Sequence, residues 1–266
     1  MIEPVRVKTE IIKDGESTVY NDFGSFVTIK VALPEGVDPE DITTGVVLDP
    51  DGTFRAVPTR VVFENDQYYA VVSSLYNSIY AVIHHNVVVT SVEGRWSEDM
   101  INNMASRMVI SNVDDFDLTA DMTRADFAVY LVNALGLEGQ MPDGSLEDVS
   151  EDTSVNRAIA ALVEKGIIMG YPDGTFKGDR TITREEMGVM IANARVFIVL
   201  ETIVNDVSAF EDLDSISTWA QDMRDIVALG VYNGYRDGTL RPKQNITHEE
   251  GLQVIYNALY LAGLID

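Results

Sequence analysis

The chain has 266 residues, a formal net charge of −24 at pH 7 and 46% hydrophobic residues, a length that predicts two domains or one domain plus a repeat array. The acidic balance argues against nucleic acid and anionic membranes as partners. No apolar run reaches the roughly 18 residues that a membrane-spanning helix needs, so no membrane insertion is expected. Because cysteine is absent, disulfides, thiol nucleophiles and zinc–thiolate sites are excluded.

Residues 1–91 predict a β domain. Turn signals such as Asp14-Gly15 and Asp49-Pro50-Asp51-Gly52 separate short runs of apolar and β-branched residues. Short strands at this spacing predict a sandwich, which we interpret as an Ig-like support or a spacer. The predicted strands cover residues 5–12, 26–31, 46–48, 56–63, 68–73 and 79–83.

The first residues, Met1-Ile2-Glu3-Pro4, lack the basic start and the apolar stretch of a secretory signal. Because strand-like sequence follows at once, we expect a fragment of a longer exported protein. Avoidance of cysteine is common in exported proteins of Gram-positive bacteria, although chance explains it equally well.

From about residue 93 the pattern becomes helical and repeats itself. The stretch Gly166–Phe176 returns as Gly230–Leu240, 64 positions later, with the shared pattern Gly-Tyr-x-Asp-Gly-Thr. Ile182–Glu186 returns at the same offset as Ile246–Glu250. A constant offset over this distance predicts repeated structural units.

A third copy diverges more from the shared pattern. Met122–Asp126 matches Ile182–Glu186 at an offset of 60, and Asp114-Asp115-Phe116 stands where the other copies have Asp-Gly-Thr. The predicted repeats therefore cover residues 92–142, 143–206 and 207–266.

Each copy predicts a helix, a turn loop and a second helix. The second helix begins with a capping box, in which a threonine oxygen accepts a backbone N–H and an acid three residues later reaches back. The pairs are Thr123 with Asp126, Thr183 with Glu186, and Thr247 with Glu250. Core stripes at helical spacing follow: Phe127, Tyr130, Leu131, Ala134 and Leu135 in the first copy, and Val254, Ile255, Ala258 and Leu259 in the third.

These motifs resemble the signature of S-layer homology domains. The resemblance covers about residues 92–263 and includes the repeat starts Glu93-Gly94-Arg95-Trp96 and Asp212-Leu213-Asp214 with Trp219. It implies a non-enzymatic anchoring module of a bacterial surface protein, located outside the cell in the cell wall or S-layer. The expected fold is α+β and multidomain: a β-sandwich domain, then a mostly α-helical pseudo-threefold trimer of repeats with a central three-helix bundle.

The resemblance also implies a ligand, a secondary cell-wall polysaccharide that commonly carries pyruvylated sugars, bound in grooves between neighbouring repeats. An arginine fork suits the carboxylate of a pyruvate ketal, and the start of a helix, with its unpaired N–H groups and dipole, favours an anion. The implied ligand-binding residues are Trp96, Arg124, Gly170, Tyr171, Asp173, Gly174, Arg184, Trp219, Gly234, Tyr235, Asp237, Gly238 and His248.

The copies depart from the family pattern in different ways. His248 replaces the arginine in the third copy, and a neutral histidine has one donor and no permanent charge. Val155 replaces the tryptophan in the second copy, and Asp115 replaces a glycine in the first. We therefore expect unequal grooves, with that of Arg184 ranked first and that of His248 last.

The same residues admit structural roles. Trp96 and Trp219 could close a core, the two arginines could pair with neighbouring acids, Asp173 and Asp237 could form turns, and Tyr171 and Tyr235 could pack.

Other chemistries find little support. Asp49–Gly52 and Asp212–Asp214 resemble a calcium loop only superficially. His84 and His85 stand at the end of a strand, where neighbours point to opposite faces, so we interpret them as exposed loop histidines rather than a metal site. No catalytic motif occurs, and paired carboxylates are unspecific among 43 acids, so we expect no enzyme, cofactor or metal. Other S-layer proteins are a second kind of partner, because a self-assembly module with decayed grooves is the alternative function.

Overall fold

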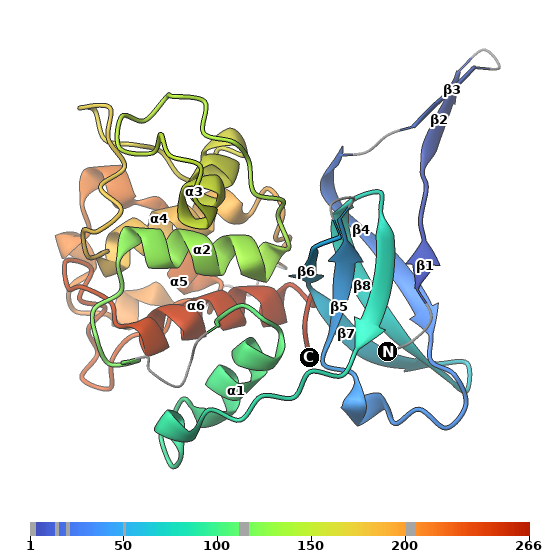
Figure 1. Ribbon diagram of the computed structural model, residues 1–266. Coiled ribbons are helices and arrows are strands. Elements are labelled where there is room, and N and C mark those ends of the chain that lie inside the picture. Colours follow the sequence, from blue (N-terminus) through green and yellow to red (C-terminus); the bar gives the residue numbers. More distant parts are fainter. Residues whose placement is uncertain (1–3, 14–15, 20–21, 50–51, 112–116, 201–205) are drawn as a thin grey trace. The chain divides into compact units, whose positions relative to one another are not determined.

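The computed structural model describes residues 4–13, 16–19, 22–49, 52–111, 117–200 and 206–266. The predicted turns at Asp14-Gly15 and Pro50-Asp51 and the divergent loop at 114–116 lie outside these residues. Strands occupy the first part of the chain and helices the second, which confirms the α+β class (Figure 1). The chain forms two compact units, one of Met1–Val113, Asn133–Leu137 and Gly263–Asp266, the other of Asp114–Val132 and Glu138–Ala262.

The first unit contains two antiparallel sheets and a hairpin. One sheet has the order β1 (Val5–Arg6), β9 (Ile79–Ile83), β5 (Thr44–Leu48), β6 (Phe54–Val57). The other has the order β4 (Asp22–Ala32), β8 (Gln67–Tyr76), β7 (Thr59–Glu64). The separate hairpin pairs β2 (Glu10–Lys13) with β3 (Glu16–Val19), and a short 3-10 helix covers Pro39–Asp41.

Side chains from both sheets share one buried core, because alternate residues of each strand point to the same face. Val31 of β4 and Val72 of β8 pack there with Val47 of β5 and Tyr80 of β9. The sequence predicted one strand over 56–63, and this is wrong. Pro58 has no N–H to donate to a ladder, so β6 ends at Val57 and β7 begins at Thr59 in the other sheet.

Helix α1 (Glu98–Ser106) belongs to this first unit. It follows a short 3-10 helix at Thr90–Val92. The predicted repeat boundaries stay predictions, since the compact units divide the first copy differently from the boundary at residue 91.

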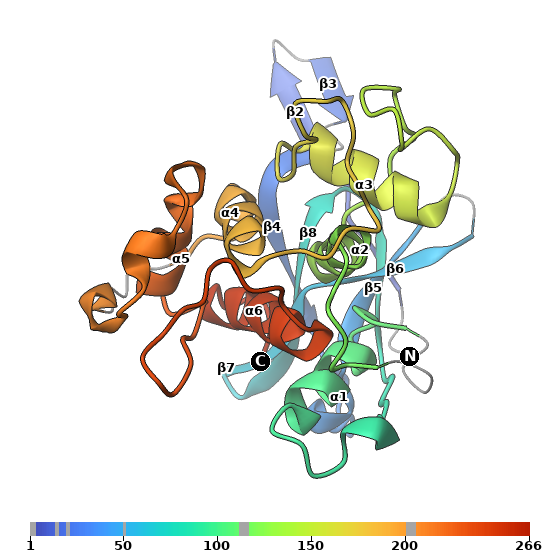
Figure 2. The same cartoon turned by 90° about the vertical axis from the view of Figure 1, so that its left-hand side faces the viewer.

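The second unit is built from helices joined by turn loops. Its α3 (Ser154–Glu164) and α4 (Arg184–Ala194) belong to the second copy, and α5 (Asp222–Ala228) and α6 (His248–Leu261) to the third. Helix α2 (Arg124–Leu135) is the second helix of the first copy. Figure 2 shows α4 and α6 beside each other. Short 3-10 helices cover Val207–Ala209, Leu213–Ser215 and Thr218–Ala220.

The predicted capping boxes and core stripes are confirmed. Thr183 and Thr247 each cap their helix together with an acid three residues on. In the first copy, the Asp126 N–H donates to the Thr123 hydroxyl at 3.1 Å, and the Thr123 N–H donates to the Asp126 carboxylate at 3.1 Å. All nine residues of the two predicted stripes are buried.

Three backbone hydrogen bonds connect the copies in a ring. The Met122 N–H donates to the Ile246 carbonyl at 2.8 Å, the Ile182 N–H to the Met122 carbonyl at 2.9 Å, and the Ile246 N–H to the Ile182 carbonyl at 3.1 Å. We name the regions where one copy meets the next the first seam (start of α2 against 169–180), the second seam (start of α4 against 233–244) and the third seam (start of α6 against 117–120).

Each copy also repeats one internal hydrogen bond from an asparagine side chain. Asn193 donates to the Ile167 carbonyl and Asn257 to the Val231 carbonyl, both at 3.0 Å. Asn133 of the first copy donates to the Val109 carbonyl at 3.1 Å. The first copy therefore keeps the internal geometry of the others. Within the described residues, the helices are too short or too polar to cross a membrane.

Candidate functional site

The second seam centres on Arg184, the first residue of α4. Its side chain is only 4% exposed, and Nε and Nη2 donate to the Leu240 and Asn233 carbonyls at 2.7 and 3.0 Å. The guanidinium lies 4.7 Å from the ring centroids of both Tyr232 and Tyr235. Arg184 thus connects its own copy to the loop of the next one by charge-assisted and cation–π contacts.

The first seam repeats this arrangement with Arg124. Its Nε and Nη2 donate to the Phe176 and Met169 carbonyls at 3.0 and 3.5 Å, and its guanidinium lies 4.7 Å from the Tyr171 and Phe176 ring centroids. Burial lowers the pKa of Arg124, and the charges of Glu186 and Asp148 oppose that shift in part. Two seams therefore share one construction.

The N–H groups at the helix starts are occupied, which corrects one prediction. The Arg124 and Arg184 N–H groups donate to the Arg180 and Gln244 carbonyls, both at 2.9 Å. The next residue of each helix donates to Gly178 or Pro242 in the same way. Neighbouring backbone carbonyls thus satisfy the N–H groups that were expected to favour an anion.

The Gly-Tyr-x-Asp-Gly-Thr loops form tight turns. The Tyr171 N–H donates to the Thr175 carbonyl at 2.7 Å, and the Asp173 carboxylate accepts the Thr175 N–H and hydroxyl. Lys177, followed by Thr175, lowers the pKa of Asp173 to about 2. Thr239, followed by Arg241, does the same for Asp237 in the next copy. The turn-forming role of both aspartates is therefore confirmed.

The glycines of these loops serve two structural purposes. Gly174 and Gly238 have φ of 82° and 81°, values that favour glycine. At Gly170 an added Cβ would collide with Leu146, and at Gly234 with Phe210, so both positions require the absence of a side chain.

Two aspartates that the site prediction missed hold the loops in place. The two carboxylate oxygens of Asp148 accept the Phe176 and Lys177 N–H groups at 2.7 Å each. Asp212 accepts the Leu240 and Arg241 N–H groups at the same distances. The signal was present in the sequence, since Glu-Asp recurs at 147–148 and 211–212 with the same offset of 64. Among the described residues no group of three or more potential metal ligands occurs.

Exposed cations surround the loop tyrosines, and these too were missed. Lys177 and Arg180 lie 4.6 and 5.5 Å from the Tyr171 ring centroid, and Arg241 lies 4.1 Å from that of Tyr235. Their side chains are 43%, 44% and 41% exposed. A basic residue directly after the Asp-Gly-Thr-Phe/Leu motif in both copies was the available signal.

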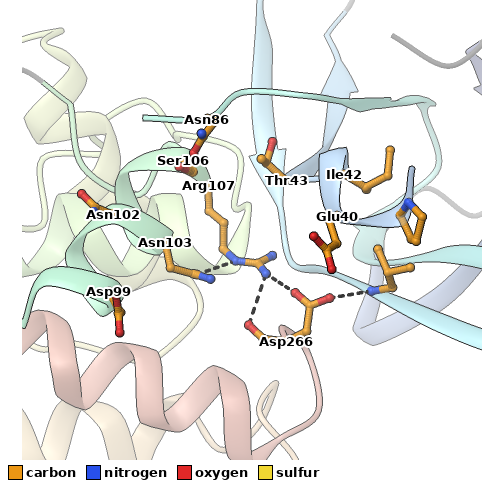
Figure 3. Close-up of a pocket in the computed structure, with 12 residues that line it drawn as sticks. Glu40, Ile42, Thr43, Asn86, Asp99, Asn102, Asn103, Ser106, Arg107 and Asp266 are labelled. Carbon is orange, nitrogen blue, oxygen red and sulfur yellow. Dashed lines mark hydrogen bonds and ion pairs between the residues drawn. The ribbon is translucent and has the colours of Figure 1, made fainter. Parts of the chain in front are cut away.

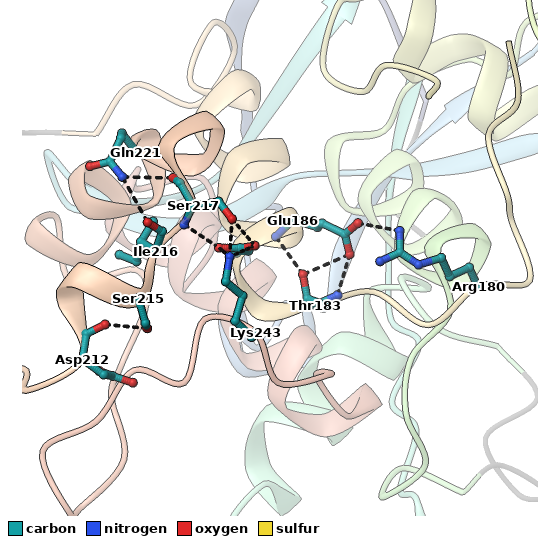
Figure 4. A network of polar contacts seen from close by, with 10 residues as sticks. Arg180, Thr183, Glu186, Asp212, Ser215, Ile216, Ser217, Gln221 and Lys243 are labelled. Atoms are coloured by element: carbon teal, nitrogen blue, oxygen red, sulfur yellow. Dashed lines mark hydrogen bonds and ion pairs between the residues drawn. The ribbon is translucent and has the colours of Figure 1, made fainter. Parts of the chain in front are cut away.

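A capping acid connects each loop tyrosine to its helix start. The Tyr171 hydroxyl donates to Glu186 at 3.0 Å, and Arg180 Nη1 donates to the same oxygen at 2.8 Å. Burial alone would raise the pKa of Glu186, but hydrogen bonds from Thr183 and the charge of Arg180 outweigh it and lower the pKa. Figure 4 shows Arg180 directed at Glu186. Burial raises the pKa of Tyr171, which stays a neutral donor.

The third seam has a different chemistry. His248 is 5% exposed, with Nδ1 3.2 Å from the Tyr130 hydroxyl and Nε2 3.7 Å from Asp126. Burial lowers the pKa of His248, although Asp126, Asp117 and Asp121 act in the opposite direction. The imidazole is therefore neutral at pH 7.

A buried carboxylate adds a further contact to the second seam. Glu185 accepts the Ser217 N–H and hydroxyl, both at 3.0 Å, and Lys243 Nζ at 2.7 and 2.9 Å. Figure 4 shows Lys243 beside Ser217. The equivalent residue of the first seam is Ala125, so the first seam lacks this carboxylate.

Comparison with known proteins identifies the second and third copies. The model of the S-layer homology domain matches residues 145–187 and 209–250, which lie in the second and third copies. The chain therefore contains S-layer homology domains over these residues. It is 30% identical over 145 residues to a cellulosome-anchoring protein of Acetivibrio thermocellus, which covers 52% of the chain and 32% of that protein.

Other relatives support the same family. A surface-layer 125 kDa protein of Lysinibacillus sphaericus is 32% identical over 140 residues, 51% of the chain and 12% of that protein. An amylopullulanase of Thermoanaerobacterium thermosulfurigenes is 29% identical over 192 residues, 71% of the chain and 10% of the enzyme. The chain thus spans a third or less of the length of these relatives. The S-layer homology domain is an anchoring module and not the catalytic part of the relatives that are enzymes. Family and relatives place the chain outside the cell, in the cell wall or S-layer.

The tryptophans at two repeat starts do not close a core. Trp96 is 62% exposed and Trp219 is 58% exposed, so the alternative of a core role is wrong. Trp219 belongs to the second unit, with the three seams, and Trp96 to the first. Their role as ligand contacts stays a prediction.

A cavity of about 580 Å³ in the first unit is organised around Arg107 (Figure 3). Arg107 donates from Nε to Asn103 at 2.7 Å, and its other nitrogens bond Asp266 and the Thr59 carbonyl. Asp266 in turn accepts the Val61 N–H at 2.8 Å. Arg107 therefore fastens the end of α1 to strand β7.

The histidine pair makes separate contacts. His84 Nδ1 lies 2.7 Å from the Asp41 carbonyl, whereas His85 Nδ1 lies 3.0 Å from the Ser106 carbonyl. Both residues follow β9, which ends at Ile83, and their two rings have different partners.

Proposed function

We propose that the chain anchors a bacterial surface protein non-covalently by binding a secondary cell-wall polysaccharide, with pyruvylated sugars, at the seams between its repeats. The observation that carries the proposal is the repeated Arg-on-Tyr construction of the first and second seams. In both, exposed cations and half-buried tyrosine rings gather on a chain whose net charge is −24. A local concentration of cations is what an acidic protein needs in order to bind an anionic polymer.

The three copies form one pseudo-threefold unit with α2, α4 and α6 as its central bundle in this proposal. The ring of backbone hydrogen bonds through Met122, Ile182 and Ile246 supports it, because each copy donates to one neighbour and accepts from the other. The common core of the two sheets in the first unit supports a β-sandwich in the same way. This domain serves as a spacer or support.

Buried Arg124 and Arg184 shape the ligand site in this account. Their side chains hold the next copy's loop by its carbonyls and position Tyr171 and Tyr235 for contact with the apolar face of a sugar. Removing either arginine is therefore expected to lose the ligand as well as the seam. The third seam, with His248, lacks this charge and is not expected to bind.

The relatives favour anchoring over catalysis. One is named a cellulosome-anchoring protein and another a surface-layer protein. The relatives with enzyme names have most of their length outside the matched stretch.

The test is cosedimentation with isolated cell walls before and after mild acid treatment that removes pyruvate ketals. We expect binding to untreated walls that weakens as salt rises, and loss of binding after the treatment. Equal binding to both preparations would contradict the role of pyruvate, and binding to neither would contradict the function.

A packing or self-assembly module is the second candidate. The Nε and Nη2 donors of both arginines favour it, because they bond backbone carbonyls of the same chain and so serve packing rather than a ligand. Light scattering would show a molecular mass that rises with concentration, without wall binding, if this candidate were correct. A monomer that binds walls would exclude it.

A further inference from the structure

We infer that Arg180, assisted by Lys177, binds the carboxylate of the ligand. The first seam therefore binds the pyruvylated sugar more tightly than the second seam does. This inference rests on the proposed function and names the charged contact within it. It reverses the ranking that the sequence suggested.

The guanidinium groups of the two seams differ in what their donors bind. Arg124 and Arg184 use both Nε and Nη2 for backbone carbonyls. Arg241 uses the same two atoms for the Thr239 hydroxyl and the Asp237 carboxylate. The forks of Arg124 and Arg184 are therefore occupied by backbone carbonyls, and that of Arg241 by residues of its own loop.

Arg180 is arranged differently. Its contacts run through Nη1, to the Tyr171 hydroxyl and to Glu186 at 2.8 Å, and its Nε and Nη2 have no protein partner among the described residues. The side chain is 44% exposed, so this fork is accessible from water. Two parallel N–H donors in one plane match the two oxygens of a carboxylate.

Lys177 provides a second cation at the same place. Its Nζ lies 4.6 Å from the centroid of the Tyr171 ring that Arg180 also contacts. Lys177 pairs with Asp173 at 2.6 Å, but that pair is exposed on both sides. Exposed ion pairs contribute little free energy, so a ligand carboxylate can replace Asp173 at small cost.

The equivalent positions in the other seams lack this arrangement. Gln244 stands at the position of Arg180 in the second seam, and Ala120 in the third. At the position of Lys177, the third seam has Asp117. The first seam thus has one cation more than the second, and the third has neither of the two exposed cations.

Reciprocal variants test this inference. Arg180→Gln gives the first seam the residue of the second, and Gln244→Arg does the reverse. The probe is a methyl hexosaminide with a 4,6-pyruvate ketal, titrated calorimetrically into the whole chain, with the methyl ester of the same sugar as the uncharged control. We expect Arg180→Gln to weaken the tighter binding step about tenfold, and Gln244→Arg to strengthen the weaker step by a similar factor.

Arg157→Gln is the matched control, since Arg157 is exposed and pairs with Asp152 away from the seams. A thermal melt of each variant checks that it is folded. Unchanged binding by folded Arg180→Gln, with normal binding by the parent chain, would overturn the inference and leave the proposed function standing. If the parent chain bound neither this sugar nor pyruvylated walls, the proposed function itself would fail. Should Arg180→Gln fail to fold, an unchanged weaker step in Gln244→Arg would overturn the inference alone.

Discussion

The two arginine seams and the histidine seam share a backbone arrangement but differ in charge. The N–H of the first helical residue donates to the next copy at 2.9 Å in Arg124 and Arg184, and at 3.1 Å in His248. The side chains of the arginines then reach further carbonyls, whereas His248 meets Tyr130 and Asp126. The backbone ring thus holds the copies together, whereas the charge of the side chain at the helix start differs from seam to seam.

The largest expected effect comes from Arg184→Ala. It leaves the Leu240 and Asn233 carbonyls without a charged donor and removes two cation–π contacts, which should reduce the free energy of unfolding by about 3 kcal/mol. His248→Ala loses less, about 1 kcal/mol, because its hydrogen bond with the Tyr130 hydroxyl joins two neutral groups. Urea denaturation measures both, and equal losses would contradict the difference between the seams.

Glu185→Ala tests a contact that the second seam has and the first lacks. It removes the acceptor for Ser217 and Lys243 and should cost about 1.5 kcal/mol in urea denaturation. The matched control is Ala125→Glu in the first seam, where Asp179 occupies the position of Lys243. A new carboxylate there has an acid as its neighbour, so this variant should be destabilised as well. If Ala125→Glu stabilised the chain, the equivalence of the two seams would be wrong.

Thr183→Ala is expected to have a smaller effect. It removes the hydroxyl that caps the Glu186 N–H, at a cost of about 1 kcal/mol. Thr247→Ala should cost the same amount, because its capping box is identical in kind. Unequal thermal shifts for the two variants would show that the seams, rather than the caps, determine helix stability.

The smallest effect concerns pH. Because the folded state lowers the pKa of His248, the unfolded chain binds a proton more readily and stability falls as the pH drops below about 6.5. His248→Gln should remove this slope between pH 7 and 5.5, measured by thermal melts, whereas Arg184→Lys should keep it. If the slope were unchanged in His248→Gln, groups other than His248 would cause the loss of stability at low pH.

Much of the repeat architecture was predictable because it depends on local signals. The capping threonines, the aspartate turns and the helical stripes each act within a few residues, and all were confirmed. Pro58 was an equally local signal, and its missing N–H explains the strand break that was not predicted.

The contacts of the seams were not predictable in the same way. Arg184 bonds Leu240, 56 positions away, and its choice of backbone carbonyls over a ligand depends on how the copies meet. The open fork of Arg180 likewise depends on Tyr171 and Glu186 taking only one of its nitrogens. Residue types indicated an anion site, but only the three-dimensional arrangement distinguishes the occupied arginines from the accessible one.

The most direct test of the whole account is native mass spectrometry of the chain with a saturating concentration of the pyruvylated methyl hexosaminide. We expect two bound sugars, one for each arginine seam, and none with the methyl ester. Three bound sugars would contradict the distinction between the arginine and histidine seams, and no bound sugar would contradict anchoring through pyruvate.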